Sequence, residues 1–172
     1  MINCLSCVNR FESNLLMMGT SNKSLMIYDV CTQKVITTYE SAHDRPIHTI
    51  SLNEHATTQG DCNLVLTSAT DGVIKLWDIR NSNQKCIRRF QQHKNAIHTI
   101  ACQMSPCIKY LVTGSEDRNT YIYDVLSGSC IHRLQSCHSD VVSSAQFVPH
   151  RSDRMATCSF DGTVKFYKNA PN

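Results

Sequence analysis

The stretch Leu64–Arg80, which reads LVLTSATDGVIKLWDIR, contains two apolar runs on either side of a polar turn. The turn holds Asp71 followed by Gly72, a dipeptide that favours a tight hairpin because glycine accepts a positive φ angle. The flanking runs are short and rich in Val, Ile, Leu and Trp, which is typical of strands rather than of helices. This segment therefore predicts two antiparallel strands joined by a tight turn.

The same pattern occurs four times along the 172 residues. Each copy ends on an aromatic residue, and these residues recur at intervals of between 44 and 49 positions: Tyr28, Trp77, Tyr123 and Tyr167. Each is preceded at constant spacing by a turn residue, namely Asn22, Asp71, Asp117 and Asp161, and further upstream by Met18, Thr67, Thr113 and Thr157. A repeat of this length, built from short strands, is the sequence signature of β-propeller blades.

Each unit reads as four short strands, since no stretch keeps a helical apolar period over three turns. The runs of the second unit are Ile47–Leu52, Leu64–Ala69, Val73–Trp77 and Cys86–Phe90, and those of the third are Ile97–Cys102, Tyr110–Ser115, Thr120–Tyr123 and Cys130–Leu134. We expect an all-β fold in a single repeat array, with blade-like units at about 1–40, 41–91, 92–136 and 137–168 and a tail at 169–172. Because the sequence ends within five residues of Tyr167, we expect the last blade to lack its outer strand.

The composition argues against several classes of function. The chain carries 17 basic and 14 acidic residues, and a net charge of +3 is too small to predict a nucleic-acid partner. The N-terminus has no basic segment followed by a long apolar run, so we expect neither a signal peptide nor insertion into a membrane. Ten cysteines without a secretory signal indicate a reducing compartment and hence an intracellular protein, cytoplasmic or nuclear.

The repeated residues resemble the WD-repeat family, although only Trp77-Asp78 is the literal dipeptide and the other units have Tyr-Asp, Tyr-Asp and Tyr-Lys. The resemblance implies four-stranded antiparallel blades, each with a buried hydrogen-bond chain from His through Ser or Thr to Asp and to the aromatic residue. Carried over by position, the chains are His43, Thr67, Asp71 and Trp77; His93, Thr113, Asp117 and Tyr123; and His138, Thr157, Asp161 and Tyr167. The first unit has Met18 and Asn22 and no matching histidine, so we expect it to be the least stable blade.

A set of His, Thr and Asp resembles a catalytic triad, but it occurs three times in register, whereas a catalytic set need occur only once. We therefore expect no catalytic residue, and a hydrolase that uses His and Cys is disfavoured. Cys4 and Cys7 form a CxxC pair, but no second pair follows at zinc spacing. The motifs of nucleotide, zinc and calcium sites are missing from the sequence, so we expect no cofactor and no metal.

The loops that enter the inner strands vary in charge while the framework repeats, which is typical of a surface that binds proteins or peptides. They carry the candidate partner-binding residues Arg45, Asn95 and Asp140. A fourth candidate, Arg80, completes a pattern similar to the WDxR box of WD-repeat receptors that dock on cullin-ring ubiquitin ligases through the damage-binding adaptor. We expect a scaffold for protein–protein interaction, with a ligase substrate receptor as the alternative.

Four blades of this shape are too few to close a ring of the usual size. An open arc would expose two apolar blade faces and unpaired strand edges, both of which favour association. Three outcomes follow: a fragment of a longer chain, a short form that pairs with itself, or a compact four-blade ring. Two copies would make eight blades, a closure that symmetry permits, and we expect a homodimer of a fragment or short form.

Overall fold

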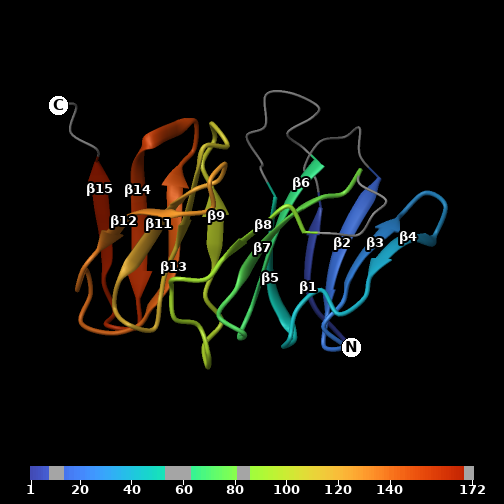
Figure 1. Ribbon diagram of the computed structural model, residues 1–172, viewed down its shortest axis with the longest axis horizontal. Coiled ribbons are helices and arrows are strands. Elements are labelled where there is room, and N and C mark those ends of the chain that lie inside the picture. The colour runs from blue at the N-terminus through green and yellow to red at the C-terminus, as the bar shows by residue number, and fades with distance from the viewer. Residues whose placement is uncertain (8–13, 53–62, 81–85, 169–172) are drawn as a thin grey trace.

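The computed structural model describes residues 1–7, 14–52, 63–80 and 86–168, and within these ranges the chain forms fifteen β-strands (Figure 1). The first two sheets contain β1 (Ile2–Cys7), β2 (Leu15–Thr20), β3 (Leu25–Asp29), β4 (Lys34–Tyr39), β5 (Ile47–Leu52), β6 (Leu64–Ala69), β7 (Ile74–Asp78) and β8 (Arg88–Phe90). The last two contain β9 (Cys102–Met104), β10 (Tyr110–Thr113), β11 (Thr120–Asp124), β12 (Cys130–Leu134), β13 (Val142–Val148), β14 (Arg151–Ser159) and β15 (Val164–Lys168).

Each sheet is made of strands that are consecutive in the chain and antiparallel to one another. The sheets are β1 to β4, β5 to β8, β9 to β12 and β13 to β15, which we name blades 1 to 4. They stand side by side in chain order, from blue to red in Figure 1. The prediction of an all-β fold built from four propeller blades is confirmed, and the fourth sheet has only three strands among the described residues. Each sheet falls within one of the four expected units, whereas the tail at 169–172 lies outside the described residues.

The second and third strands of every blade are joined by a turn with one residue in the left-handed region. These residues are Lys23 (φ 67°), Gly72 (φ 74°), Arg118 (φ 67°) and Gly162 (φ 77°). Asn or Asp precedes each of them, and its short polar side chain suits a turn. The repeat therefore sets the hairpin geometry even where glycine is replaced.

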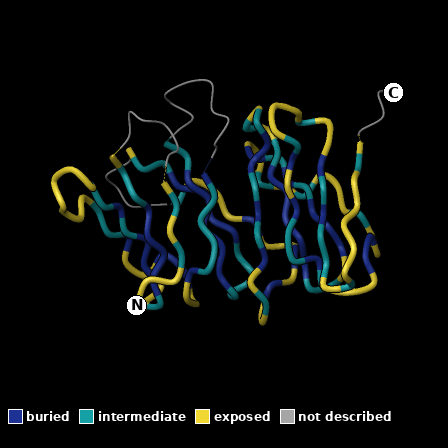
Figure 2. The backbone as a smooth tube through the Cα atoms, turned by 180° about the vertical axis from the view of Figure 1, so that it is seen from behind, coloured by how far each residue is buried: buried dark blue, intermediate teal, exposed yellow. Residues whose placement is uncertain are grey.

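The apolar core lies between blades rather than within them. One cluster joins blade 1 to blade 2, a second joins blade 2 to blade 3, and a third joins blade 3 to blade 4. Trp77, for example, packs with Met17 and Ile27 of the preceding blade. In Figure 2 the buried segments run through the interior strands, and the exposed strand that leads to the C-terminus is β15.

The inner strand of blade 3 differs from the expected run Ile97–Cys102, because the strand β9 begins only at Cys102. The cause is Glu116, whose Oε1 accepts hydrogen bonds from the backbone N–H groups of residues 96, 97 and 98 at 2.9, 2.6 and 2.9 Å. These bonds hold the segment as a loop and leave the side chain of Ile97 78% exposed. A distant carboxylate thus overrides a local strand propensity.

Candidate functional site

Blade 2 contains a continuous buried chain of polar side chains. Nδ1 of His43 lies 2.9 Å from Oδ2 of Asp71, and Nε2 lies 2.8 Å from Oγ1 of Thr67. Trp77 donates from Nε1 to the same hydroxyl oxygen at 2.8 Å. An ionised Asp71 only accepts, so His43 donates from Nδ1, and Thr67 accepts from Trp77 and donates to Nε2. Every side chain in the set is thereby satisfied.

The Asp71 carboxylate also ties together two backbone segments. It accepts from the N–H of Asp44 at 3.0 Å and from the N–H of Val73 at 3.1 Å. Burial raises the pKa of Asp71, but the hydrogen bonds from His43 and from these backbone groups outweigh it, so the pKa lies below its ordinary value. Asp71 therefore stays ionised while it links the loop before β5 to the turn between β6 and β7.

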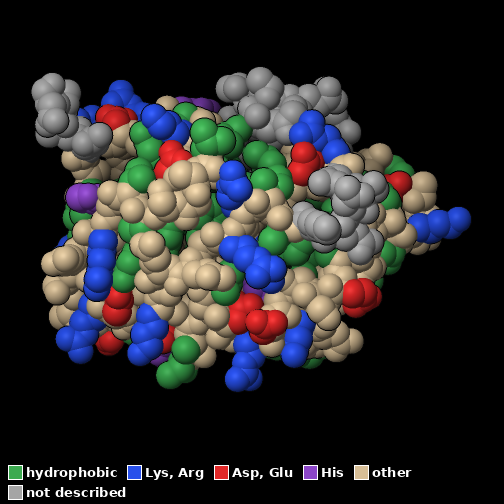
Figure 3. Space-filling view, in the orientation of Figure 1, with side chains coloured by type: hydrophobic (Ala, Val, Ile, Leu, Met, Phe, Trp, Pro, Cys, Tyr) green, Lys and Arg blue, Asp and Glu red, His purple; other side chains and the backbone are tan. Residues whose placement is uncertain are grey.

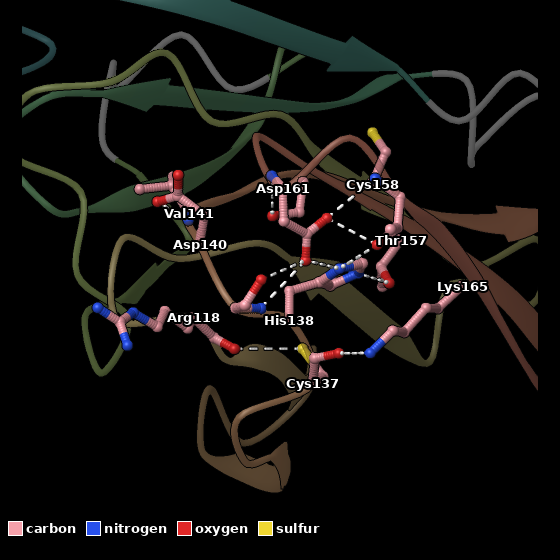
Figure 4. Close-up of polar contacts among 12 residues, drawn as sticks. Arg118, Cys137, His138, Asp140, Val141, Thr157, Cys158, Asp161 and Lys165 are labelled. Carbon is pink, nitrogen blue, oxygen red and sulfur yellow. Dashed lines mark hydrogen bonds and ion pairs between the residues drawn. The ribbon is translucent and has the colours of Figure 1, made fainter.

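Blade 4 repeats this arrangement (Figure 4). Nδ1 of His138 lies 3.0 Å from Oδ2 of Asp161, and Nε2 lies 2.8 Å from Oγ1 of Thr157. A hydrogen bond from the Thr163 hydroxyl is the main cause that lowers the pKa of Asp161. Tyr167 takes the place of tryptophan; burial raises the pKa of its hydroxyl, and the Thr157 side chain partly offsets this.

Two lysines that the sequence reading missed complete these networks. Lys75 on β7 donates from Nζ to the carbonyl oxygen of Ala42, and Lys165 on β15 donates to the carbonyl oxygen of Cys137. Ala42 and Cys137 each stand directly before the histidine of their blade. The lysine thus fixes the loop that carries the histidine, and the signal in the sequence was the recurrence of lysine two residues before the aromatic.

Blade 3 has Tyr121 at the lysine position, and its polar chain is rearranged. The expected links from Asp117 to His93 and from His93 to Thr113 do not form. Oδ2 of Asp117 instead accepts from the Tyr121 hydroxyl at 2.6 Å and from Arg133 at 3.3 Å. Thr113 donates to the carbonyl oxygen of Gly114. The tyrosine hydroxyl reaches the carboxylate that the histidine would otherwise bind.

His93 turns to the other tyrosine of the blade. Its Nδ1 lies 3.1 Å from the hydroxyl oxygen of Tyr123, which also accepts from the backbone N–H groups of Gln92 and His93 at 3.1 and 2.9 Å. Nε2 of His93 is buried without a partner among the described residues. Burial lowers the pKa of His93 to about 4, so the ring is neutral near pH 7. Tyr123 therefore holds His93 through its own hydroxyl, in direct contact with Nδ1, and not through a threonine that links the histidine to the aromatic residue.

The candidate partner-binding residues of the loops divide into two kinds. Arg45 and Asp140 are exposed, and the Asp140 carboxylate accepts from the N–H of Val141 at 2.7 Å. Asn95 is only 2% exposed, so a partner cannot reach it, and its prediction as a contact residue was wrong. Its amide lies 3.3 Å from Nε2 of His48, between blades 2 and 3, because the small polar side chain turns into the interface rather than to solvent.

Arg80 follows β7 directly, and its side chain is 58% exposed. Its Nε and Nη2 donate to the two carboxylate oxygens of Asp78 at 2.9 and 2.7 Å. This bidentate pair is the main cause that lowers the pKa of Asp78. The guanidinium is thus held in one orientation on the surface.

A family model described as WD domain, G-beta repeat matches residues 33–78, 84–124 and 128–168, which is more than half of the chain. The chain belongs to the WD-repeat family. This confirms the resemblance in the sequence, and it agrees with the four sheets of the structure.

Curated relatives of this WD-repeat chain are much longer. The Denticleless protein homolog of Gallus gallus is 31% identical over 104 residues, which are 60% of this chain and 14% of that protein. The WD repeat domain-containing protein 83 homolog of Dictyostelium discoideum is 29% identical over 140 residues, 81% of this chain and 39% of that protein. The DDB1- and CUL4-associated factor 11 homolog of Caenorhabditis briggsae is 23% identical, covering 77% and 23%.

Two solved structures share the fold of this WD-repeat chain. The WD40 β-propeller domain of Doa1 has a TM-score of 0.76 at 18% identity, covering 98% of this chain and 51% of that chain. A chain of the mitotic checkpoint complex has a TM-score of 0.73 at 22% identity, covering 91% and 44%. At these identities the likeness shows the fold alone, and this chain covers about half of each matched chain.

Among the described residues no group of three or more His, Cys, Asp and Glu could hold a metal ion. Cys4 is half-buried and Cys7 is exposed. No described helix is long and apolar enough to cross a membrane.

Proposed function

We propose that this WD-repeat chain is a non-catalytic scaffold that binds proteins in a reducing compartment, cytoplasmic or nuclear, and that a second copy of the chain is one of its partners. One observation carries the proposal. On the outer side of blade 4, Phe166 is 77% exposed and Val164 is 58% exposed, and no described residue covers them. The strand register places Ala156 and Cys158 beside them, and we call these four residues the open face of blade 4.

The other blades show how such a face is used. Ile74 and Leu76 of β7 occupy the positions that Val164 and Phe166 occupy in β15, and they are 0% and 3% exposed because blade 3 packs on them. A fully buried large apolar side chain contributes about 1.5–3 kcal/mol relative to an exposed one. The open face of blade 4 is therefore of the kind that another blade covers.

Blade 1 offers the complementary surface. The register of β1, β2 and β3 places Leu5, Leu16, Met26 and Tyr28 on the side that faces away from blade 2, and we call them the open face of blade 1. The same side of blade 2 packs on blade 1. A second copy can thus follow blade 4 head to tail, and two identical contacts related by a twofold axis close a ring. That the chain spans 51% of the Doa1 propeller chain supports this size.

The test is the solution mass by light scattering after size exclusion, over a range of concentrations. We expect a dimer for the parent chain and a monomer for Phe166→Ser. The control is Leu126→Ser, which removes an apolar side chain that is 80% exposed but lies in the turn between β11 and β12. A parent chain that is monomeric at every concentration would exclude self-association.

A second candidate function is that of substrate receptor for a cullin-ring ubiquitin ligase. It is favoured by the fixed, exposed guanidinium of Arg80 in the WDxR pattern, and by a relative whose name gives it association with DDB1 and CUL4. Purified damage-binding adaptor should then bind the parent chain and lose affinity for Arg80→Ala. The control is Arg45→Ala, which removes another exposed arginine. Equal binding by the two variants would reject this role for Arg80.

A further inference from the structure

A cleft of about 340 Å³ opens at the rim between blades 3 and 4, beside the strand β15. Its apolar lining includes Tyr110, Ile122, Leu134, Phe147, Met155 and Tyr167. Its charged lining is formed by Lys168, by Arg154 and by Asp153, whose carboxylate lies 3.9 Å from Nε of Arg154. One long edge of β15 pairs with β14, and no described strand pairs with the other edge. In Figure 3, Lys and Arg side chains lie among hydrophobic ones over this end of the molecule. The cleft thus combines a free strand edge with apolar walls.

The first three blades show what fills this position when an outer strand is present. Their outer strands share a five-residue pattern of a small apolar residue, isoleucine, two variable residues and a large apolar residue: Val35–Tyr39 (VITTY), Cys86–Phe90 (CIRRF) and Cys130–Leu134 (CIHRL). The molecule therefore contains three copies of a template for a strand that would complete blade 4.

The two ends of the template face different neighbours, because a bulge interrupts the pairing in blades 1 and 3. The last residue packs on the next blade: the ring of Tyr39 lies 5.2 Å from that of Trp77, and the ring of Phe90 lies 5.4 Å from that of Tyr123. The first residue stands opposite the aromatic of its own blade, as Cys130 does opposite Tyr123. In blade 4 the last position lies opposite Val164 on the open face, and the first position lies opposite Tyr167, which lines the cleft.

The charge next to the template differs in blade 4. In blades 1 to 3 the residue after the aromatic is aspartate, and Asp29 stands opposite Lys34 at the start of the outer strand. In blade 4 that residue is Lys168, paired across the hairpin with Arg154. Opposite charges across a strand pair are favourable and like charges are not. A strand that completes blade 4 should therefore begin with an acidic residue where blade 1 has lysine.

We infer that β15 and its cleft bind an extended segment of a partner protein, which pairs with β15 as an antiparallel strand. The sequence of this segment is an acidic residue, a small apolar residue, isoleucine, two variable residues and a large apolar residue. The inference rests on the proposed function, because it names the binding site and the partner's chemistry. Backbone hydrogen bonds to a strand edge give affinity, and pockets for alternate side chains give specificity. In blade 2 the N–H of Ile87 donates to the carbonyl oxygen of Leu76 at 2.7 Å, and the carbonyl of Phe166 is the equivalent acceptor.

The test uses two fluorescent peptides and the full chain, with binding followed by anisotropy. One peptide, EVITTY, is β4 with Lys34→Glu, and the other, KVITTY, is β4 unchanged. We expect saturable binding of EVITTY and at least about fivefold weaker binding of KVITTY. In the chain variant Lys168→Glu the preference should reverse, which a merely structural role of Lys168 would not produce. A matched control, Lys94→Glu, changes an exposed lysine in the loop between blades 2 and 3, outside the cleft lining, and should leave the preference unchanged.

Absence of saturable binding by either peptide would overturn the inference, as would equal preference in the parent chain and in Lys168→Glu. EVITTY that binds only the monomeric Phe166→Ser variant would show that a second copy, and not a partner segment, covers β15. The two proposals fail separately. A monomeric chain that binds EVITTY keeps the strand site and loses self-association, and a dimer that binds neither peptide does the reverse.

Discussion

At the scale of single residues, one carboxylate in blade 2 and one in blade 4 join segments that are distant in sequence. Asp71 accepts hydrogen bonds from His43, from the backbone of the loop before β5 and from the backbone of its own turn. Asp161 binds His138 and the N–H of Ser139 in the same way. Each of these carboxylates is buried or nearly so, and its removal would leave the groups that donate to it without an acceptor.

Replacing Asp71 by asparagine should lower the free energy of unfolding at pH 7 by about 1–3 kcal/mol, because an amide cannot accept all the donors that converge there. The pKa of Asp71 is lowered in the folded state, so its stabilisation is present above the unfolded-state pKa and is lost as the pH falls through the folded-state pKa. The difference between the parent and Asp71→Asn should therefore shrink below about pH 4. Urea denaturation from pH 7 to pH 3 measures both effects.

The control for this prediction is Asp140→Asn, the same chemical change at an exposed position. It should leave the free energy of unfolding within about 0.5 kcal/mol of the parent at every pH. An Asp71→Asn variant that tracked this control would mean that the buried chain contributes nothing to stability.

The buried His93 and the partly buried His48 predict a second pH effect, in which a base rather than an acid gains a proton as the pH falls. Burial is the main cause that lowers the pKa of His48 and of His93 to about 4. The folded state holds both rings neutral, so stability should fall as the pH drops from about 6.5, the unfolded-state value, toward 4. In His93→Gln the slope over this window should be shallower by up to about 1.4 kcal/mol per pH unit. Identical slopes in urea denaturation would refute the buried, neutral state of His93.

At the scale of elements, each turn between the second and third strands places one residue in the left-handed region. Two blades have glycine there, and the other two have a residue with a Cβ, for which this conformation is unfavourable. Gly162 has φ 77°, and a Cβ at that position would meet nothing within 4 Å. Arg118 has φ 67° at the equivalent position of blade 3. The left-handed conformation costs a residue with a Cβ roughly 1–2 kcal/mol, so the same turn is strained in one blade and relaxed in the other.

The two reciprocal substitutions should therefore act in opposite directions. Gly162→Ala should destabilise by about 1 kcal/mol through backbone strain alone. Arg118→Gly should stabilise by less than about 1 kcal/mol, because glycine also increases the entropy of the unfolded chain. Thermal unfolding by calorimetry compares the pair directly. Changes of the same sign would show that side-chain contacts, rather than φ, decide these positions.

The repeat predicted the elements well, because hairpins are local and the hydrophobic period is short. Position in the repeat also placed His43 and His138 in their blades, since the same residue types recur at the same spacing. It could not anticipate blade 3, where the hydroxyl of Tyr121, four residues after Asp117, donates to the Asp117 carboxylate. Nor could it anticipate that Asn95 would turn into an interface, because that depends on the neighbouring blade. The errors arose where a substitution within the repeat redirected a hydrogen bond, as Tyr121 does, or where a side chain met the neighbouring blade, as Asn95 does.

At the scale of the whole molecule, stability is a series of contacts between neighbouring blades. Each apolar cluster joins two adjacent blades, so each blade depends mainly on its neighbours. Blade 1 has Met18 at the hydroxyl position and only one neighbouring blade among the described residues. Thr20 donates within its own turn to the carbonyl oxygen of Ser24, and Asn3 and Cys4 donate to the carbonyl oxygen of Ile47 in blade 2 at 3.3 and 3.8 Å. Blade 1 should therefore be the first to separate.

The single tryptophan of the chain offers a direct measurement of this separation. Trp77 is 4% exposed and lies in the cluster shared by blades 1 and 2, against Tyr39. We expect its fluorescence to shift at lower urea than the far-ultraviolet circular dichroism, which reports all four sheets. Tyr39→Ser should move the fluorescence transition further down and leave the main dichroism transition nearly in place.

The matched variant is Phe90→Ser, which removes the equivalent ring between blades 2 and 3. It should move both transitions, because blade 2 links blade 1 to the rest of the arc and its loss exposes Trp77 as well. Transitions that coincide for the parent chain and for both variants would mean that the arc unfolds as one cooperative unit. In that case the contact between blades 1 and 2 is as strong as the others, and the missing polar chain of blade 1 is replaced by packing of Met17 and Ile27 on Trp77.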